Sequence, residues 1–365
     1  MHAERITRAR ERMTELGVDV LLLSLGADLP YLTGYEAMPL ERLTMLVLPR
    51  DGDATLVVPR LEAPRVVERP DAFTLLPWDE TDDPVGIVAG LAGTPGVAAI
   101  GDRTWARFLV DLQKLLSKVQ WRKASEVTSP LRARKDNAEI IALRAASQAA
   151  DRVAAQLQAG DIPLVGRTEH EVSQDIGNRL IAEGHARVNF AIVGAGENAA
   201  SPHHEPGARV INRGEVVLCD FGGTMPDGYC SDITRCVWTG TDPTPEMRDL
   251  YTVLQDAQAQ AVDAATVGMP CEDVDGVARR LITDAGYGPQ FFHRTGHGIG
   301  LEEHEDPYIV GGNCERLAPG HAFSVEPGIY LAGRTGARIE DIVIATDAGP
   351  ESLNHVTHDL VVVDS

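Results

Sequence analysis

The stretch FFHRTGHGIGLEEHEDP, residues 291–307, places three histidines and a row of carboxylates among glycines. The glycines disfavour a helix, because glycine is a poor helix former. An extended strand would still put His293 and His297 on one face, since strand side chains alternate. The residue order matches neither the H-E-x-x-H pattern of helical zinc sites nor a G-x-G-x-x-G dinucleotide loop. His293, His297 and His304 are therefore candidate metal ligands, general bases or structural residues.

Composition limits the classes of protein to consider. The chain has 365 residues, 44% of them hydrophobic and 24% charged, which is typical of a globular protein of two domains. The longest apolar run, VDVLLLSLG at 18–26, has the length of a strand and is too short to span a bilayer. A formal charge of −21 repels nucleic acid and anionic membranes, so we expect neither as a partner.

The cysteines and the start of the chain bear on the compartment. Five cysteines without a C-x-x-C pair argue against a disulfide framework. The first 17 residues mix acidic with basic side chains and lack an apolar signal segment. Both observations lead us to expect a cytoplasmic protein.

The pattern of elements changes along the chain. A helix at 5–17 and short strands such as DVLLLS, RLTMLVLP and DATLVVP predict a small α/β domain over residues 1–128. The Ser-Pro turn and charges within 124–137 are typical of a linker. From 129 to 365, helices at 136–158, 168–183, 245–265 and 271–285 alternate with β-rich segments, which predicts an α+β domain on an antiparallel sheet.

Four carboxylates lie in apolar, strand-like runs. Asp220 and Asp232 flank a hairpin whose turn holds an Asp-Gly pair, so they should lie near each other. Glu326 in FSVEPGIY and Glu340 in GARIEDIVI should not be buried without a compensating cation. A shared divalent metal would compensate all four. Taken singly, the aspartates could equally be turn residues, and the glutamates could pair with a base such as Arg338.

A second histidine cluster lies in ENAASPHHEPG, residues 197–207. His203 and His204 follow the predicted strand VNFAIVGAG, and loops at strand ends often carry catalytic side chains. An ordinary surface position is as good an interpretation from the sequence alone.

The order of these residues resembles the metal-binding set of the pita-bread metallopeptidases, family M24, in the Xaa-Pro dipeptidase and Xaa-Pro aminopeptidase branch. The motifs that carry the resemblance are DFGG, SDITR, HRTGHGIGLEEHEDP, SVEPGIY and RIED. It implies a pita-bread catalytic domain at 129–365 behind a creatinase-like N-terminal domain at 1–128. It also implies two divalent ions, most commonly manganese, with cobalt or zinc as alternatives. The implied metal ligands are Asp220, Asp232, His297, Glu326 and Glu340.

The resemblance assigns roles to these side chains. Asp220 and Asp232 would hold one ion, His297 and Glu326 the other, with Asp232 and Glu340 bridging. His203 would stabilise the oxyanion, and Glu326 would pass a proton to the leaving nitrogen. The remaining residues implied at the substrate are His293, His304 and Arg338.

Two departures from the family pattern stand out. Asp220 and Asp232 are twelve positions apart, one more than in many members, and we place the extra residue in the turn. Tyr308 stands where some Xaa-Pro dipeptidases carry an arginine suited to a dipeptide carboxylate.

The resemblance implies hydrolysis of the bond between an N-terminal residue and proline. Xaa-Pro dipeptidase is the leading hypothesis, and an aminopeptidase acting on longer peptides is the alternative. A metal-free, creatinase-like or non-catalytic protein is the remote alternative. A homodimer is expected, with Tyr31 or Tyr35 at the rim of the partner's active site.

Overall fold

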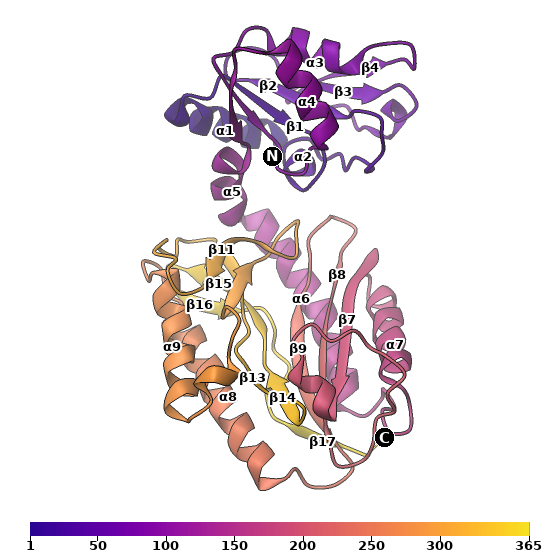
Figure 1. Cartoon of the computed structure of the whole chain (residues 1–365), viewed down its shortest axis with the longest axis vertical. Coiled ribbons are helices and arrows are strands. Elements are labelled where there is room, and N and C mark those ends of the chain that lie inside the picture. The colour runs from indigo at the N-terminus through magenta and orange to yellow at the C-terminus, as the bar shows by residue number, and fades with distance from the viewer. Residues whose placement is uncertain (365) are drawn as a thin grey trace. The chain divides into compact units, whose positions relative to one another are not determined.

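The structure is a computed structural model that describes residues 1–364, and it divides into two compact units, 1–132 and 133 onward (Figure 1). The division falls within residues 124–137, where a linker was expected, but most of that segment is helical, because α5 occupies Ser125–Ala133. Pro130 lies inside this helix. A proline removes one helical hydrogen bond, and for this reason the segment resembled a loop in the sequence.

The N-terminal unit is the α/β domain expected from its alternating pattern. One mixed six-stranded sheet has the order β4-β3-β2-β1-β5-β6. Its strands are β1 Val20–Leu23, β2 Met45–Pro49, β3 Thr55–Pro59, β4 Thr74–Trp78, β5 Val97–Ile100 and β6 Gln120–Lys123. Its helices are α1 His2–Leu16, α2 Asp28–Thr33, α3 Pro84–Ala92 and α4 Ala106–Leu115.

The expectation that Tyr31 or Tyr35 forms an exposed rim is not supported. Both side chains are buried within the N-terminal unit. The Tyr31 hydroxyl donates a hydrogen bond to the Leu131 carbonyl, and the Arg5 guanidinium covers its ring. Tyr31 is therefore part of the core of this unit.

The four helices predicted for the C-terminal unit are confirmed. They are α6 Asn137–Gln158, α7 Glu169–Ala182, α8 Pro245–Ala264 and α9 Cys271–Asp284. Helix α6 starts at a capping box of Asp136 and Glu139, and α7 starts at a second one of Thr168 and Glu171. These reciprocal side-chain bonds satisfy free N–H groups, which explains why the helix starts could be predicted closely.

The expected antiparallel arrangement of this unit is also confirmed, in two sheets and a hairpin. The first sheet has the order β17-β9-β8-β7, in which only β17 and β9 are parallel among the described residues. The second has the order β11-β10-β12-β15-β16, and β13 pairs with β14. The strands are β7 Arg187–Ala195, β8 Val216–Thr224, β9 Ile233–Thr239, β10 Gly296–Gly298, β11 Glu305–Ile309, β12 Ala322–Val325, β13 Gly328–Leu331, β14 Thr335–Arg338, β15 Asp341–Thr346, β16 Gly349–Ser352 and β17 Val361–Val363.

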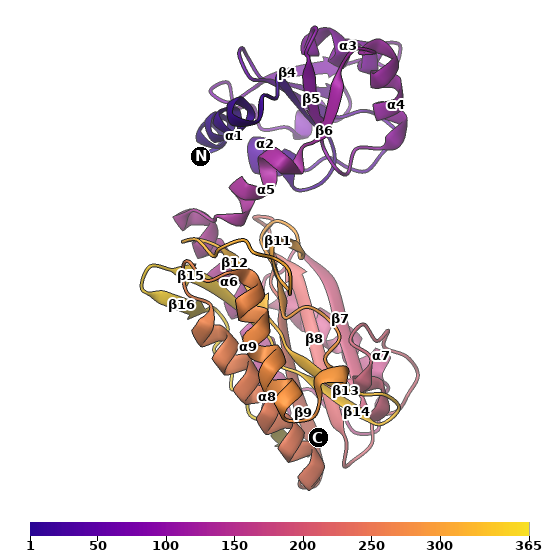
Figure 2. The same cartoon turned by 60° about the vertical axis from the view of Figure 1, so that its left-hand side comes forward.

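Helix pairs cover the outer faces of these sheets. Helices α8 and α9 pack side by side on one flank, while α6 and α7 contact β7, β8 and β9 on the other (Figure 2). Each pair encloses its own hydrophobic core, one containing Leu254 and Phe323 and the other Leu157 and Phe221. The first core also contains Leu218, which lies two residues before Asp220 on the same face of β8, so apolar packing and polar residues share the inner face of this sheet.

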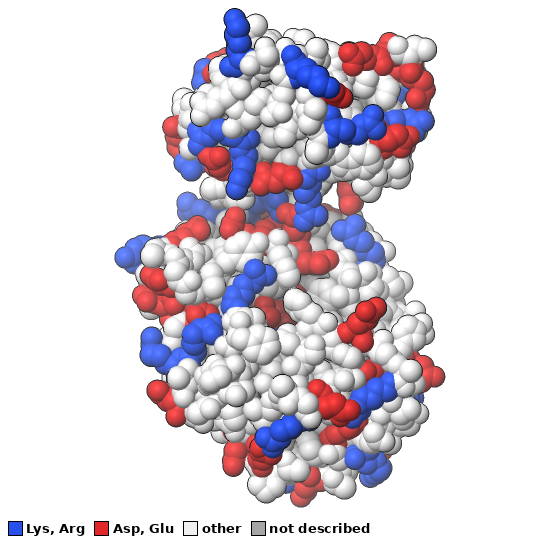
Figure 3. All heavy atoms as spheres, in the orientation of Figure 1, with Lys and Arg blue, Asp and Glu red and all other residues white. Residues whose placement is uncertain are grey.

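The surface of the C-terminal unit mixes charges of both signs on the face shown in Figure 3. Within residues 1–364, none of the helices is both long enough and apolar enough to cross a membrane.

A buried ion pair fastens the two sheets together. Arg235 on β9 contacts Asp341 on β15 at 2.8 Å, and both side chains are inaccessible to solvent. The same guanidinium donates hydrogen bonds to the carbonyl oxygens of Thr234 and Glu340. Arg235 therefore fixes the backbone beside Glu340, one of the predicted metal ligands.

Replacing Arg235 with methionine should destabilise the C-terminal unit by about 3–5 kcal/mol, because Asp341 would stay buried without its guanidinium partner. All five cysteines lie in this unit, and four of them are buried. Thiol labelling along a urea gradient therefore reports its unfolding alone. As a matched control, Arg334→Met breaks the exposed pair with Glu246 and should cost under about 1 kcal/mol. Equal shifts of the labelling midpoint in the two variants would contradict this prediction.

Candidate metal centre

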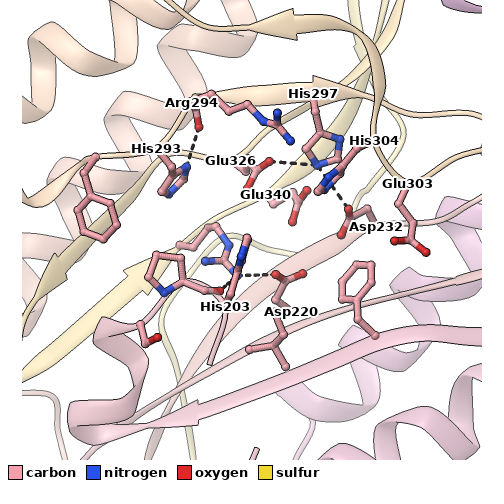
Figure 4. Close-up of a pocket in the computed structure, with 16 residues that line it drawn as sticks. His203, Asp220, Asp232, His293, Arg294, His297, Glu303, His304, Glu326 and Glu340 are labelled. Carbon is pink, nitrogen blue, oxygen red and sulfur yellow. Dashed lines mark hydrogen bonds and ion pairs between the residues drawn. The ribbon is translucent and has the colours of Figure 1, made fainter. Parts of the chain in front are cut away.

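The five predicted metal ligands line one cavity of about 800 Å³ in the C-terminal unit (Figure 4). Asp220 lies in β8, and Asp232 immediately precedes β9. His297 is the central residue of β10. Glu326 directly follows β12, and Glu340 lies between β14 and β15. Residues from both sheets thus meet at the inner face of the unit.

The strand register explains how the two aspartates converge. Asp220 lies opposite Thr234 across the β8–β9 ladder, and the same register continues to the bridge between Thr224 and Cys230. Asp232 is two residues from Thr234 and so projects from the same face as Asp220. The extra residue in the twelve-position spacing therefore lies in the turn after Thr224, where it leaves the register intact.

Three of the five side chains form a compact donor group. One ligand atom from each of Asp232, His297 and Glu340 lies within 4.8 Å of the others, and all three residues are buried. Oxygens of Asp220, Asp232 and Glu340 are buried without a hydrogen-bond partner among residues 1–364. An unsatisfied buried carboxylate oxygen is costly. These oxygen and imidazole donors fit a divalent cation.

The electrostatics of the cavity favour the same conclusion. Burial and the neighbouring carboxylates raise the pKa values of Asp232 and Glu340 well above the usual range. Burial also raises the pKa of Asp220, although Arg338 opposes it. Carboxylates this close repel one another when ionised. Bound cations would instead lower the pKa values of these carboxylates, because their charge favours the ionised form of each ligand.

His297 is held in an orientation suited to a ligand. Its Nδ1 lies 3.1 Å from the Gly298 carbonyl oxygen, which can only accept, so Nδ1 carries a proton. Its Nε2 points into the cavity, 3.2 Å from Glu326 Oε1 and 3.8 Å from Asp232 Oδ2. Burial raises the pKa of Glu326, but its interactions with His297, His293 and Arg338 together outweigh burial and lower that pKa to about 2.

Arg338 was predicted to bind substrate, and the structure shows it buried behind the metal ligands. Its Nε donates to Thr234 Oγ1 at 3.1 Å, and Nη1 donates to the Tyr330 hydroxyl at 2.8 Å. Nη2 forms an ion pair with Asp220. Thr234 in turn donates to Glu340 Oε2 at 2.8 Å. Sequence reasoning missed Thr234 and Tyr330, although both stand inside the quoted motifs SDITR and SVEPGIY.

His293 does not share a strand with His297, so that expectation is wrong. The strand is confined to β10, and His293 lies in the loop before it. Its Nδ1 donates to the Arg294 carbonyl at 2.7 Å, and its Nε2 accepts from the Tyr330 hydroxyl at 2.9 Å. Burial lowers the pKa of His293, so the imidazole is neutral near pH 7. It lines the cavity with both ring nitrogens already bonded.

His304 and His203 differ from His293 in being free to contact a ligand. Both line the cavity, both are exposed, and neither has a hydrogen-bond partner within residues 1–364. The His304 ring packs 4.0 Å from the His297 ring, measured between centroids. The next residue, Glu305, forms a buried ion pair with Lys135 at 2.7 Å, which fixes the backbone beside His304.

His204 anchors the loop that carries His203. Its Nε2 lies 2.8 Å from a carboxylate oxygen of Glu169, which is fully buried at the start of α7. Glu169 also accepts hydrogen bonds from the Ala195 amide and the Asn198 side chain. The adjacent histidines of this loop thus have different functions, one structural and one facing the cavity. Only the buried position of Glu169, which is invisible in the sequence, separates them.

Gly296 and Gly298 serve backbone packing and do not make room for a ligand. A Cβ on Gly296 would lie 1.8 Å from the Ser324 carbonyl oxygen, and one on Gly298 would lie 2.2 Å from that of Asp306. These contacts allow β12 and β11 to approach β10 closely, which brings Glu326 beside His297.

Other residues that line the cavity were not singled out from the sequence. Phe190, Ile192 and Phe292 supply apolar wall, while Arg294 and Glu303 add charge. Phe292 is 64% exposed at the rim. Phe292, Arg294 and Glu303 lie within the histidine-rich stretch. The direction in which their side chains point depends on the loop conformation, which the sequence does not reveal.

Comparisons with known proteins agree with this geometry. Residues 141–347 match the model of metallopeptidase family M24, and residues 5–134 match the creatinase/prolidase N-terminal domain. A probable dipeptidase PepE of Mycobacterium tuberculosis is 43% identical over 100% of this chain and 97% of its own length. The crystal structure of dipeptidase PepE from Mycobacterium ulcerans, also 43% identical, superposes with a TM-score of 0.94 over 100% of this chain and 98% of that one. An Xaa-Pro dipeptidase of Lactobacillus delbrueckii subsp. lactis is 36% identical over 96% of each chain.

Replacing Glu169 with alanine should loosen residues 196–207, because the buried Ala195 amide and the His204 ring would lose their acceptor. The loss of such hydrogen bonds costs about 1–3 kcal/mol, which corresponds to roughly 10- to 100-fold faster amide exchange in this loop. Hydrogen–deuterium exchange measures it without reference to catalysis. Glu171→Ala is the matched control, since Glu171 is exposed and bonds to Thr168. Unchanged exchange of the loop in Glu169→Ala would refute the anchoring role.

Proposed function

The chain belongs to metallopeptidase family M24, and on that premise we propose that it hydrolyses the bond between an N-terminal residue and proline in dipeptides. It is a metallopeptidase that uses divalent metal ions. The observation that carries the proposal is the convergence of Asp232, His297 and Glu340, with Asp220 and Glu326, at one cavity. Names of relatives support the substrate class, because these proteins are called dipeptidase and Xaa-Pro dipeptidase.

The proposal assigns two ions to the five ligands. Asp220 and Asp232 would hold one ion and His297 and Glu326 the other, with Asp232 and Glu340 bridging. The compact group of Asp232, His297 and Glu340 supports a bridging position for the two carboxylates. Divalent ions supply Lewis acidity for a carbonyl and lower the pKa of water, which provides a nucleophile near neutral pH. Oxygen-rich donors suit manganese, with cobalt and zinc as alternatives.

The surrounding side chains supply binding and proton transfer. His203 and His304, both exposed and unpaired in the cavity, can donate hydrogen bonds to the substrate carbonyl as negative charge develops. We assign Glu326 the transfer of a proton to the leaving imino nitrogen, because its carboxylate lines the cavity beside the other proposed ligands. His293 and Arg338 act as positioning residues, since their bonds to Tyr330 and Asp220 hold the cavity wall.

Proline suits this cavity for a physical reason. The bond before proline is a tertiary amide without an N–H, so recognition cannot depend on a backbone hydrogen bond there. The apolar side chains of Phe190, Ile192 and Phe292 offer a surface for the pyrrolidine ring.

An aminopeptidase acting on longer peptides is the second candidate. Tyr308, in place of the arginine that would suit a dipeptide carboxylate, favours it. The proposal also includes a homodimer and a cytoplasmic location, which light scattering and fractionation would test.

Asp232→Ala and Glu340→Ala should each abolish metal binding and turnover together, since each ligand is shared in the proposed site. Even residues outside the ligand set commonly change affinity or activity by 10- to 100-fold, so we expect a loss of more than about 100-fold in kcat/KM. Elemental analysis and peptide hydrolysis provide the two measurements. Asp227→Ala, in the exposed turn of the same hairpin, should retain both properties. Two ions per chain in either ligand variant would overturn the assignment.

Xaa-Pro dipeptides should be cleaved with a higher kcat/KM than Xaa-Pro-Yaa tripeptides after loading with manganese, cobalt or zinc. The assay compares Ala-Pro with Ala-Pro-Ala by detection of released alanine. Faster cleavage of the tripeptide would favour the aminopeptidase. No cleavage of either peptide by metal-loaded protein would exclude both activities.

A further inference from the structure

We propose that the guanidinium of Arg294 binds the free carboxylate of the dipeptide substrate and so makes the enzyme selective for dipeptides over longer peptides. This inference rests on the proposed function. It names the residue that recognises the C-terminal end of the substrate.

A dipeptide brings a full negative charge into a cavity that is already acidic. Five acidic residues line it: Asp220, Asp232, Glu303, Glu326 and Glu340. Glu303, unlike the other four, is outside the predicted metal set, so bound cations would not neutralise it directly. A substrate carboxylate therefore needs its own cationic partner to bind here.

Among the described residues, the cavity offers two permanently charged cations, Arg338 and Arg294. Arg338 is buried, and its Nε and both terminal nitrogens already bond to Thr234, Tyr330, the Pro202 carbonyl and Asp220. Diverting it to substrate would leave Asp220 without its counter-charge. Arg338 therefore holds the residues of the metal centre in place and is not free to bind the substrate carboxylate.

Arg294, in contrast to Arg338, has a guanidinium that is free to bind a substrate. It is half-buried in the cavity wall, and its guanidinium makes no hydrogen bond or ion pair within residues 1–364. The guanidinium carbon lies 4.5 Å from the centre of the Tyr308 ring. Stacking on an aromatic face leaves the N–H groups at the edge of the guanidinium free, in the planar fork that matches a carboxylate.

The backbone of Arg294 is fixed on both sides. Its carbonyl accepts the Nδ1–H of His293, whose own carbonyl accepts a bond from Arg279. The next residue, Thr295, donates two bonds to buried Asp275. Figure 4 shows the Arg294 side chain extending from beside His293 toward His297 and His304. The fork is thus held near the proposed metal ligands before substrate arrives, which lowers the entropic cost of binding.

This placement has a defined kinetic consequence. The carboxylate is remote from the bond that breaks, so its contact with Arg294 stabilises the ground state and the transition state alike. Loss of such a contact raises KM and leaves kcat nearly unchanged. A longer peptide carries a neutral amide at this position and gains nothing from the charge.

The test compares Ala-Pro with Ala-prolinamide, which differ only in the terminal charge, using metal-loaded wild-type enzyme, Arg294→Ala and Arg294→Lys. Arg294→Ala should raise KM for Ala-Pro by roughly 10- to 100-fold and change that for Ala-prolinamide by less than about 2-fold. Arg294→Lys keeps the charge but loses the planar fork, so its KM for Ala-Pro should lie between those of the wild type and Arg294→Ala. Arg280→Ala, an exposed arginine on α9, is the matched control and should equal wild type.

A second variant separates a specific effect from general damage. Because Arg294 lies over the Tyr308 ring, an arginine at 308 can reach the same space, so Tyr308→Arg in the Arg294→Ala background should recover Ala-Pro binding at least partly. Equal KM increases for both substrates would overturn the proposal. Asp-Pro serves as a third substrate. A KM increase confined to Asp-Pro would also overturn the proposal, because Arg294 would then recognise the N-terminal side chain.

A binding measurement keeps the inference independent of turnover. Calorimetry should show that the metal-loaded wild type binds L-proline more tightly than L-prolinamide, and that Arg294→Ala removes the difference. If wild type cleaves neither substrate but shows this difference, the proposed function fails and the inference about Arg294 stands. Equal affinities in the wild type would refute the inference, whatever the activity.

Discussion

The repulsion among buried carboxylates at the inner face of the two sheets is the constraint on which the C-terminal unit depends. Asp220, Asp232 and Glu340 have buried oxygens without hydrogen-bond partners, and ionising them together without a cation is unfavourable. Arg338 offsets part of this charge, and Arg235 holds the backbone where the sheets meet. The strands are thus arranged around carboxylates whose repulsion would be relieved by protonation or by a bound cation.

Much of this arrangement could be predicted from the sequence, because the relevant signals are local. Asp220 follows the apolar run VVLC, and the Asp-Gly turn fixes the hairpin that returns Asp232 to it. Capping residues such as Asp136 and Thr168 mark the helix starts. The resemblance to a known family then supplied roles that no local pattern contains.

The features that escaped prediction depend on contacts between distant segments. The segment with Pro130 forms a helix despite its proline, and Thr128 and Arg132 of this helix both bond to Asp28 at the start of α2. The glycines at 296 and 298 fit against neighbouring strands that lie up to 28 residues later in the chain. His204 and His203 look alike in the sequence, yet only the first meets Glu169. In each case the deciding neighbour comes from another element, and spacing along the chain does not reveal it.

Metal bound by the unsatisfied carboxylates would also link folding to the supply of metal. A ligand that binds only the native state stabilises it by RT ln(1 + [L]/Kd), or about 2.7 kcal/mol at a hundred times Kd. Metal bound by these side chains would therefore add to the stability of the C-terminal unit as well as to catalysis. The fraction of chains that survives proteolysis in the cell would then rise with the concentration of available ions, so metal status would regulate the amount of enzyme as well as its rate.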